Sequence, residues 1–156
     1  MKSLLLVLSI CIAATAFGRD NPKAVTRPPY DEALAKRLGG DERGMKSYVL
    51  VILKTGPKAD ISKEESSKLF GGHMVNIRRL ADEGKLLVAG PMTPNDRNYE
   101  GIFIFNVKTT KEAEALLASD PAVAAGALAF EAYGWYGSAA LQEVVDIHGR
   151  IDKTGR

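Results

Sequence analysis

The feature that most restricts the fold of this chain is the order of strand-like and helix-like segments between residues 45 and 137. Four short runs are rich in β-branched and aromatic residues, a composition that favours strands. They lie at residues 47–53, 85–89, 101–107 and 127–136. Two segments with apolar residues at helical spacing interrupt them, at residues 62–83 and 109–118. The order β-α-β-β-α-β predicts an α+β domain of the ferredoxin-like type.

The longer helical segment carries a histidine on its apolar stripe. Ser62 and Glu65 form a capping-box pattern at its start. His73 lies four residues after Leu69 and four before Ile77, so we expect its side chain to face the sheet. A buried imidazole needs a hydrogen-bond partner. His73 is therefore either a core histidine bonded to a backbone carbonyl or a general acid or base, because imidazole titrates near neutral pH.

Two glycines immediately precede this histidine. Gly71 and Gly72 lie inside the predicted helix, where each costs about 1 kcal/mol relative to alanine. Small residues so close to the imidazole would leave space for a ligand or for a neighbouring backbone. The glycine pair thus favours a functional role for His73.

The second helical segment is followed by Asp120 and Pro121. An Asp-Pro dipeptide commonly opens a turn, and this role alone explains the pair. If the carboxylate instead reached His73, it would orient the imidazole, as in other histidine–carboxylate pairs. The sequence leaves both interpretations open.

Four further residues are weaker candidates for binding a substrate. Gly90 and Pro91 end the second strand, where backbone free of side chains can be approached by a ligand. Trp135 ends the last strand and serves either in packing and interfaces or as a stacking surface. Arg79 could bind an anionic group, or it extends from the helix into solvent.

Composition and charge exclude several classes of protein. The chain has 156 residues, 46% hydrophobic and 26% charged, with a net charge of +2, as expected of one globular domain. Its nearest approach to a basic patch is the pair Arg78–Arg79, so we expect no nucleic-acid partner. The two histidines, His73 and His148, make no metal motif, and no acidic cluster has calcium-loop spacing. We therefore expect neither a metal nor a cofactor.

The N-terminus predicts a secretory signal peptide over residues 1–18. Lys2 precedes an apolar run at residues 3–14, and small residues follow, so we expect cleavage near Ala16–Gly18. The run is shorter than the ~20 residues of a membrane-spanning helix. A buried N-terminal helix is the alternative interpretation.

The single cysteine, Cys11, lies within the predicted signal peptide. A lipoprotein would use it as the attachment point, but Ile10 before it is larger than the residue usual at that position. After cleavage the chain would contain no cysteine, which suits an oxidising compartment. The expected location is therefore the periplasm or the cell exterior.

Two segments flank the predicted domain. Residues 19–44 form a leader with a possible short helix at residues 31–38, ended by Gly39. Residues 138–156 form a C-terminal tail. Within it, residues 141–147 fit either a final strand or a helical turn.

Several short motifs occur in a specific order along the domain. They are Gly72-His73-Met74, residues 77–91, residues 101–107, Glu112-Ala113, Asp120-Pro121-Ala122-Val123 and Trp135-Tyr136. Together they resemble the YCII-related (YciI-like) family over residues 45–137. The resemblance implies a dimeric α/β-barrel in which two four-stranded sheets pack together, and hence a homodimer. It also implies a pocket holding a histidine and an aspartate, which correspond to His73 and Asp120.

The hypothesis that follows is a cofactor-independent lyase or isomerase acting on a small organic molecule. His73 would move a proton and Asp120 would hold it. Most of the family has no assigned activity, but the resemblance extends to an enzyme that eliminates HCl from a ring-derived substrate and to muconolactone isomerase-like barrels. The alternatives are a non-catalytic periplasmic module that binds a small molecule, a module that only dimerises, and a haem-binding barrel.

Overall fold

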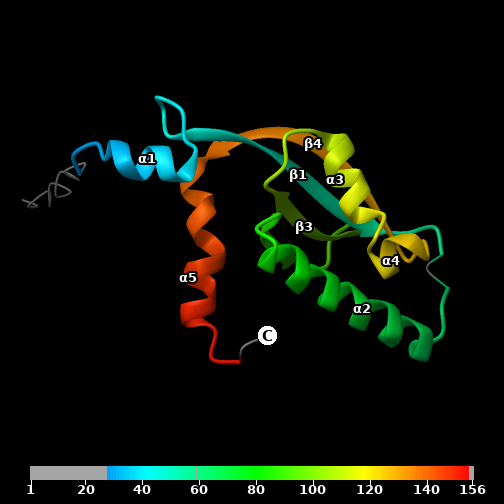
Figure 1. The fold of residues 1–156 in the computed structure, drawn as a ribbon. Coiled ribbons are helices and arrows are strands. Elements are labelled where there is room, and N and C mark those ends of the chain that lie inside the picture. Colours follow the sequence, from blue (N-terminus) through cyan, green and yellow to red (C-terminus); the bar gives the residue numbers. More distant parts are fainter. Residues whose placement is uncertain (1–27, 59, 155–156) are drawn as a thin grey trace, which may run out of the picture. The chain divides into compact units, whose positions relative to one another are not determined.

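The computed structural model describes residues 28–58 and 60–154 (Figure 1). The chain divides before Asp31 into two units, and the second unit, Asp31–Arg156, contains the whole fold described below. The predicted signal peptide lies outside the described residues. Among the described residues, no helix combines the length and the apolar character needed to cross a membrane.

The centre of the fold is one antiparallel sheet with the strand order β2-β3-β1-β4. Its strands are β1 (Met45–Thr55), β2 (Leu86–Pro91), β3 (Tyr99–Phe105) and β4 (Leu128–Ser138). Strands β1 and β4 pair over their full length, from Met45 opposite Ser138 to Thr55 opposite Leu128. In each β-α-β unit a third strand lies between the two that the helix connects. This arrangement confirms the predicted ferredoxin-like α+β fold.

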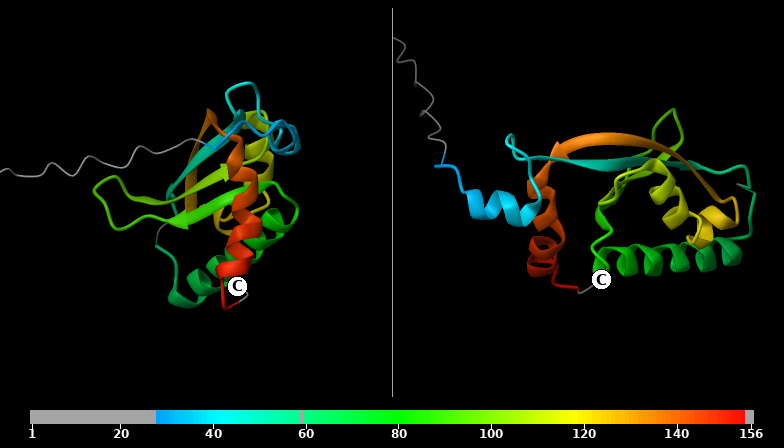
Figure 2. Two further views of the ribbon diagram at one scale, coloured as in Figure 1. Left: turned by 90° about the vertical axis from the view of Figure 1, so that its left-hand side faces the viewer. Right: turned by 45° about the horizontal axis from the view of Figure 1, so that its top comes forward.

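Three helices cover one face of the sheet (Figure 2). They are α2 (Lys63–Asp82), α3 (Thr110–Leu117) and the one-turn helix α4 (Pro121–Ala124). The Ser62 side chain accepts a hydrogen bond from the Glu65 backbone N–H at 3.1 Å, as its capping pattern predicts. The Asp120-Pro121 dipeptide predicted only a turn after α3. The structure places α4 there.

The main core lies between this face and the helices. Its fully enclosed members are Val49, Val51, Leu53, Leu80, Leu86, Phe103, Phe105, Ala113, Leu117, Ala122, Ala127 and Leu128. Because successive strand residues point to opposite faces, Tyr48 and Ile104 belong to a smaller cluster on the other side, together with Leu87. The sheet therefore has one face covered by helices and one face that is only partly covered.

Helices also occur at both ends of the described chain. Helix α1 (Glu32–Leu38) ends at Gly39, whose φ of 69° is in the left-handed region that glycine adopts readily. After β4 follow a 3-10 helix, η1 (Ala139–Glu143), and α5 (Val144–Ile151). Residues 141–147 are thus helical rather than a final strand. Leu141 and Val145 pack on the smaller cluster, at one end of the partly covered face.

Candidate active site

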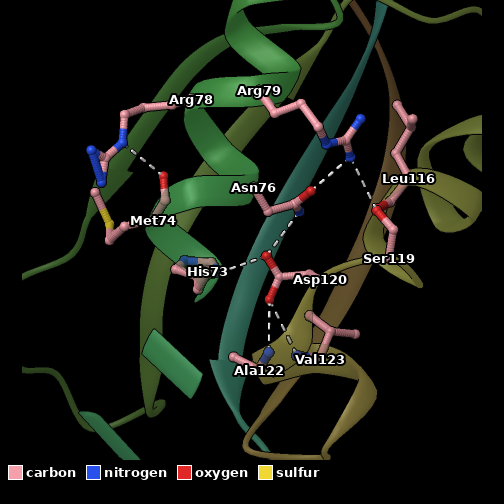
Figure 3. A network of polar contacts seen from close by, with 10 residues as sticks. All are labelled: His73, Met74, Asn76, Arg78, Arg79, Leu116, Ser119, Asp120, Ala122 and Val123. Atoms are coloured by element: carbon pink, nitrogen blue, oxygen red, sulfur yellow. Dashed lines mark hydrogen bonds and ion pairs between the residues drawn. The ribbon is translucent and has the colours of Figure 1, made fainter. Parts of the chain in front are cut away.

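Helices α2 and α4 bring His73 and Asp120 into direct contact. His73 Nδ1 lies 2.8 Å from Asp120 Oδ2 (Figure 3). The exposed fraction is 8% for His73 and 0% for Asp120, so the contact is almost free of water. The partner of the imidazole is therefore a carboxylate, and the backbone-bonded core histidine is not what the structure shows.

The close approach of α4 to α2 depends on Gly72. A Cβ added at Gly72 would lie 2.9 Å from Cγ of Pro121, whereas a Cβ at Gly71 would meet nothing within 4 Å. The proline ring is rigid, so it cannot move aside without moving α4. Glycine at this position allows Asp120, the residue before Pro121, to reach the ring of His73.

Asp120 accepts hydrogen bonds on both carboxylate oxygens. Oδ2 accepts from His73 and from Asn76 Nδ2, the latter at 3.0 Å. Oδ1 accepts from the backbone N–H groups of Ala122 and Val123 at 3.0 and 3.3 Å, which makes Asp120 the N-cap of α4. Burial alone would raise the pKa of the Asp120 carboxyl, but the hydrogen bonds from His73 and Asn76 outweigh it and hold that pKa below its ordinary value. Asp120 is thus a carboxylate at neutral pH.

Asn76 is a member of this network that the sequence analysis missed. Its exposed fraction is 7%, and its Oδ1 accepts a hydrogen bond from Arg79 Nη2 at 2.7 Å. The sequence contained one indication of this role, because Asn76 lies three residues after His73, on the same face of the helix. Asn76 links Asp120 to the surface arginine and fixes the second hydrogen bond to the carboxylate.

The guanidinium of Arg79 forms contacts with other residues of the protein. Besides Asn76 it contacts Ser119 Oγ at 3.3 Å (Figure 3). It also donates to Glu83 Oε1 at 2.6 Å. Its guanidinium therefore connects α2 to the residue before Asp120. Arg79 lies next to Asn76 rather than next to His73, and its hydrogen bond orients the Asn76 side chain.

The other ring nitrogen of His73 is available to a ligand. Nε2 has no hydrogen-bond partner among the described residues, and none of their completely buried side-chain nitrogen or oxygen atoms lacks one, so Nε2 is not completely buried. The ring stacks on Phe103, with centroids 5.8 Å apart, and meets Phe70 edge-on at 6.0 Å. Phe70 is 40% exposed. One nitrogen of His73 is thus fixed by a carboxylate, and the other has no partner among the described residues.

The remaining candidates lie apart from this pair. Trp135 contacts Tyr48, with ring centroids 5.9 Å apart, on the sheet face that points away from α2. Gly90 and Pro91 lie on the edge strand β2, opposite Ile102 and Gly101. Their neighbour Ala89 is opposite Phe103, so they lie one and two residues beyond the ring that supports His73. The structure does not bring Trp135 together with His73.

Within residues 28–58 and 60–154, no group of three His, Cys, Asp or Glu side chains is placed to hold a metal ion. His73 and Asp120 form a hydrogen-bonded pair of an imidazole and a carboxylate. An ionised, buried carboxylate fixes Nδ1 as the nitrogen that carries the proton, which leaves the lone pair of a neutral imidazole on Nε2.

A comparison with known proteins supports the family resemblance that the order of the motifs indicates. The YCII-related domain matches residues 18–133, which is more than half of the chain. The chain belongs to the YCII-related family. It is 35% identical over 85 residues to Protein YciI of Escherichia coli O6:H1 and, equally, to Protein YciI of Shigella flexneri. Each match covers 50% of this chain and 86% of the relative.

A solved structure with a more distant likeness is 5-chloro-2-hydroxyhydroquinone dehydrochlorinase from Burkholderia phenoliruptrix AC1100, in complex with 2,5-dihydroxybenzoquinone. It is 20% identical, with a TM-score of 0.43, and the likeness covers 56% of this chain and 92% of that one. At this distance the likeness carries no information on activity. His73, Asp120 and α2 all lie inside the segment that matches the YCII-related domain, whereas η1 and α5 lie after it.

Proposed function

We propose that this YCII-related protein is an acid–base enzyme of the lyase or isomerase type that acts on a small organic molecule. The observation that carries the proposal is the asymmetry of His73, whose Nδ1 is held by a buried carboxylate while Nε2 has no partner among the described residues and is not completely buried. The exposed ring of Phe70 and the stacked ring of Phe103 give the imidazole an apolar surrounding, which suits an organic substrate with a ring or a short carbon skeleton.

The chemistry follows from this geometry. The lone pair on Nε2 takes a proton from a carbon or hydroxyl group of the substrate, and the resulting imidazolium is stabilised by Asp120. His73 then returns the proton, either to another carbon in an isomerisation or to a departing group in an elimination. Asn76 and Arg79 do not touch the substrate. They are positioning residues, because their hydrogen bonds hold Asp120 in the orientation that His73 needs.

The proposal is tested by proton exchange from carbon in D2O, followed by NMR. Small lactones and hydroxylated quinones serve as probes, with wild-type protein, His73→Gln and Met74→Gln. Met74 is adjacent on α2 but 48% exposed, so its substitution is a matched control. We expect wild type and Met74→Gln to exchange a probe proton about 10²–10⁴-fold faster than His73→Gln. Equal rates for wild type and His73→Gln would contradict the proposal.

A non-catalytic binding module is the second candidate, and the same open nitrogen favours it. A ligand that hydrogen bonds to Nε2 would raise the melting temperature of the protein by mass action. In that case the probe would be recovered unchanged and without deuterium, and His73→Gln would lower its affinity. Exchange of a probe proton that depends on His73 distinguishes the enzyme from the binding module.

We also propose a homodimer that uses the partly covered sheet face. Tyr133 and Trp135 are exposed there, beside the partly buried Leu50 and Ile102. An apolar surface of this kind commonly marks an association site. Sedimentation should give twice the mass of one chain, and Tyr133→Lys should shift it toward one chain, whereas Tyr30→Lys in the leader should not. A wild-type protein that sediments as a single chain would contradict the proposal.

Finally, we propose that the protein is exported to the periplasm or the cell exterior. Support comes from the sequence alone, namely Lys2, the apolar residues 3–14 and the small residues that end at Ala16. The intact mass of the protein purified from its native host should correspond to a chain that begins after Ala16 or Gly18. A mass that still includes the first residues would exclude cleavage.

A further inference from the structure

A cavity lies between the C-terminal half of α2, the edge strand β2 and α5. Its volume is about 200 Å³, and eight of its ten lining residues are apolar. Ile77 and Ala81 contribute from α2, Val88 from β2, and Val144 and Val145 from α5. These α2 residues lie one and two helical turns beyond His73, so the cavity is separate from the site of the proposed reaction.

The two ionisable residues in the lining are both basic. They are Arg78 and His148, and the lining contains no aspartate or glutamate. Arg78 uses Nε to donate to the carbonyl oxygen of Met74 at 3.2 Å (Figure 3). In the described part of the chain, no carboxylate lies within ion-pair distance of its guanidinium. The neighbouring Arg79 differs, because its guanidinium already donates hydrogen bonds to Glu83, Asn76 and Ser119.

The C-terminal helix completes this cavity. Val144, Val145 and His148 all follow residue 133, where the match to the YCII-related domain ends. The segment that the family shares therefore supplies only α2 and β2 as walls. The third wall and one of the two basic residues come from α5.

We propose that this cavity binds a small organic monocarboxylate. The carboxylate of the ligand would contact Arg78 and His148. The planar guanidinium of Arg78 can donate two parallel hydrogen bonds to such an anion. The apolar body would lie against Ile77, Val88 and Val144. Sites for drug-sized ligands usually measure ~300–1,000 Å³. A volume of about 200 Å³ limits this ligand to a short chain or a single ring.

The test uses the full-length chain and hexanoate as the probe, with binding followed by ¹H–¹⁵N NMR. We expect saturable shifts at residues 77–81, 86–89 and 144–148. Hexan-1-ol and hexylammonium, which have the same chain but no negative charge, should bind at least about tenfold more weakly, as expected for the loss of a charge-assisted hydrogen bond.

Two pairs of variants locate the site. Arg78→Gln should weaken hexanoate binding at least about tenfold, whereas Arg97→Gln, at an exposed loop residue, should not. Val144→Trp should block the cavity, whereas Ile147→Trp, on the exposed side of α5, should not. The spectrum of each variant without ligand shows whether it is folded.

Four results would overturn the proposal. They are the absence of saturable shifts, shifts confined to residues around His73, equal affinity for hexanoate and hexan-1-ol, and full affinity in Arg78→Gln. A fifth result would also contradict it. If signals from α5 changed with protein concentration alone, the cavity would be occupied by a second copy of the chain.

Discussion

Between the sheet and the helices that cover one of its faces, three polar side chains, His73, Asn76 and Asp120, are buried and hydrogen bonded. On the opposite face, two aromatic side chains are exposed. His73 and Asp120 lie 8% and 0% exposed, whereas Tyr133 and Trp135 lie 48% and 37% exposed. This is the reverse of a simple division into apolar inside and polar outside. Such reversals mark functional surfaces, because each has a cost that stability alone does not explain.

The source of this free-energy cost differs between the two faces. On the covered face, every buried polar group of the His73 network has a partner, and a half-satisfied network would be worse than an apolar core. On the other face, the rings of Tyr133 and Trp135 are exposed in the single chain. The comparison predicts that changes on the covered face alter the stability of the single chain, while changes on the other face alter association.

The largest effect is expected from Asp120→Ala. The substitution removes the partner of His73 and Asn76 inside the protein and leaves two N-terminal amides of α4 uncapped. Breaking a buried pair in this way costs about 3–5 kcal/mol. Urea unfolding should show this loss, whereas Asp96→Ala, in the exposed loop before β3, should change the free energy of unfolding by less than about 0.5 kcal/mol.

A milder variant separates two roles of this residue. Asn is as good an N-cap as Asp, so Asp120→Asn should retain much of the stability of α4. It lacks the charge that stabilises a protonated imidazole, so proton exchange that depends on His73 should still fall. If Asp120→Ala and Asp96→Ala unfold alike, the network contributes nothing to stability and the comparison between the two faces fails.

The parts of this protein that the sequence predicts are those with local causes. Helical spacing placed His73 on the buried stripe, and Ser62 marked the start of α2 through its own capping hydrogen bond. Residues 141–147 were ambiguous because seven residues complete only two helical turns, too few to separate the helical period from alternation.

Other features depend on contacts between distant segments. The meeting of His73 with Asp120 requires α4 to approach Gly72, and no single segment encodes that approach. Trp135 faces away from His73 because β4 pairs Trp135 with Tyr48, and a shift of one residue would reverse its direction. Asn76 was missed because asparagine in a helix usually belongs to the solvent-exposed face, and here its partner comes from α4.

An intermediate effect is expected from alanine at the two adjacent glycines. Gly72→Ala places a Cβ 2.9 Å from Pro121 and should destabilise the protein by about 1–3 kcal/mol. Gly71→Ala meets nothing within 4 Å and should stabilise it by about 0.5–1 kcal/mol, because alanine is the better helix former. Thermal unfolding of the two variants compares them directly, and equal effects would show that α4 does not need Gly72.

The smallest effect is a difference in how stability depends on pH. Hydrogen bonds from His73 and Asn76 hold the pKa of Asp120 in the folded protein below its ordinary value of 3.8. As pH falls through that range the unfolded chain binds a proton first, so stability that is fully present above about pH 4 is lost toward the lower folded pKa. One proton changes the free energy of unfolding by at most about 1.4 kcal/mol per pH unit. Asp120→Asn lacks this proton, so urea unfolding between pH 3 and pH 5 should give it a shallower loss than wild type. The other carboxylates are common to both proteins, and identical slopes would mean that the Asp120 carboxyl is no more acidic folded than unfolded.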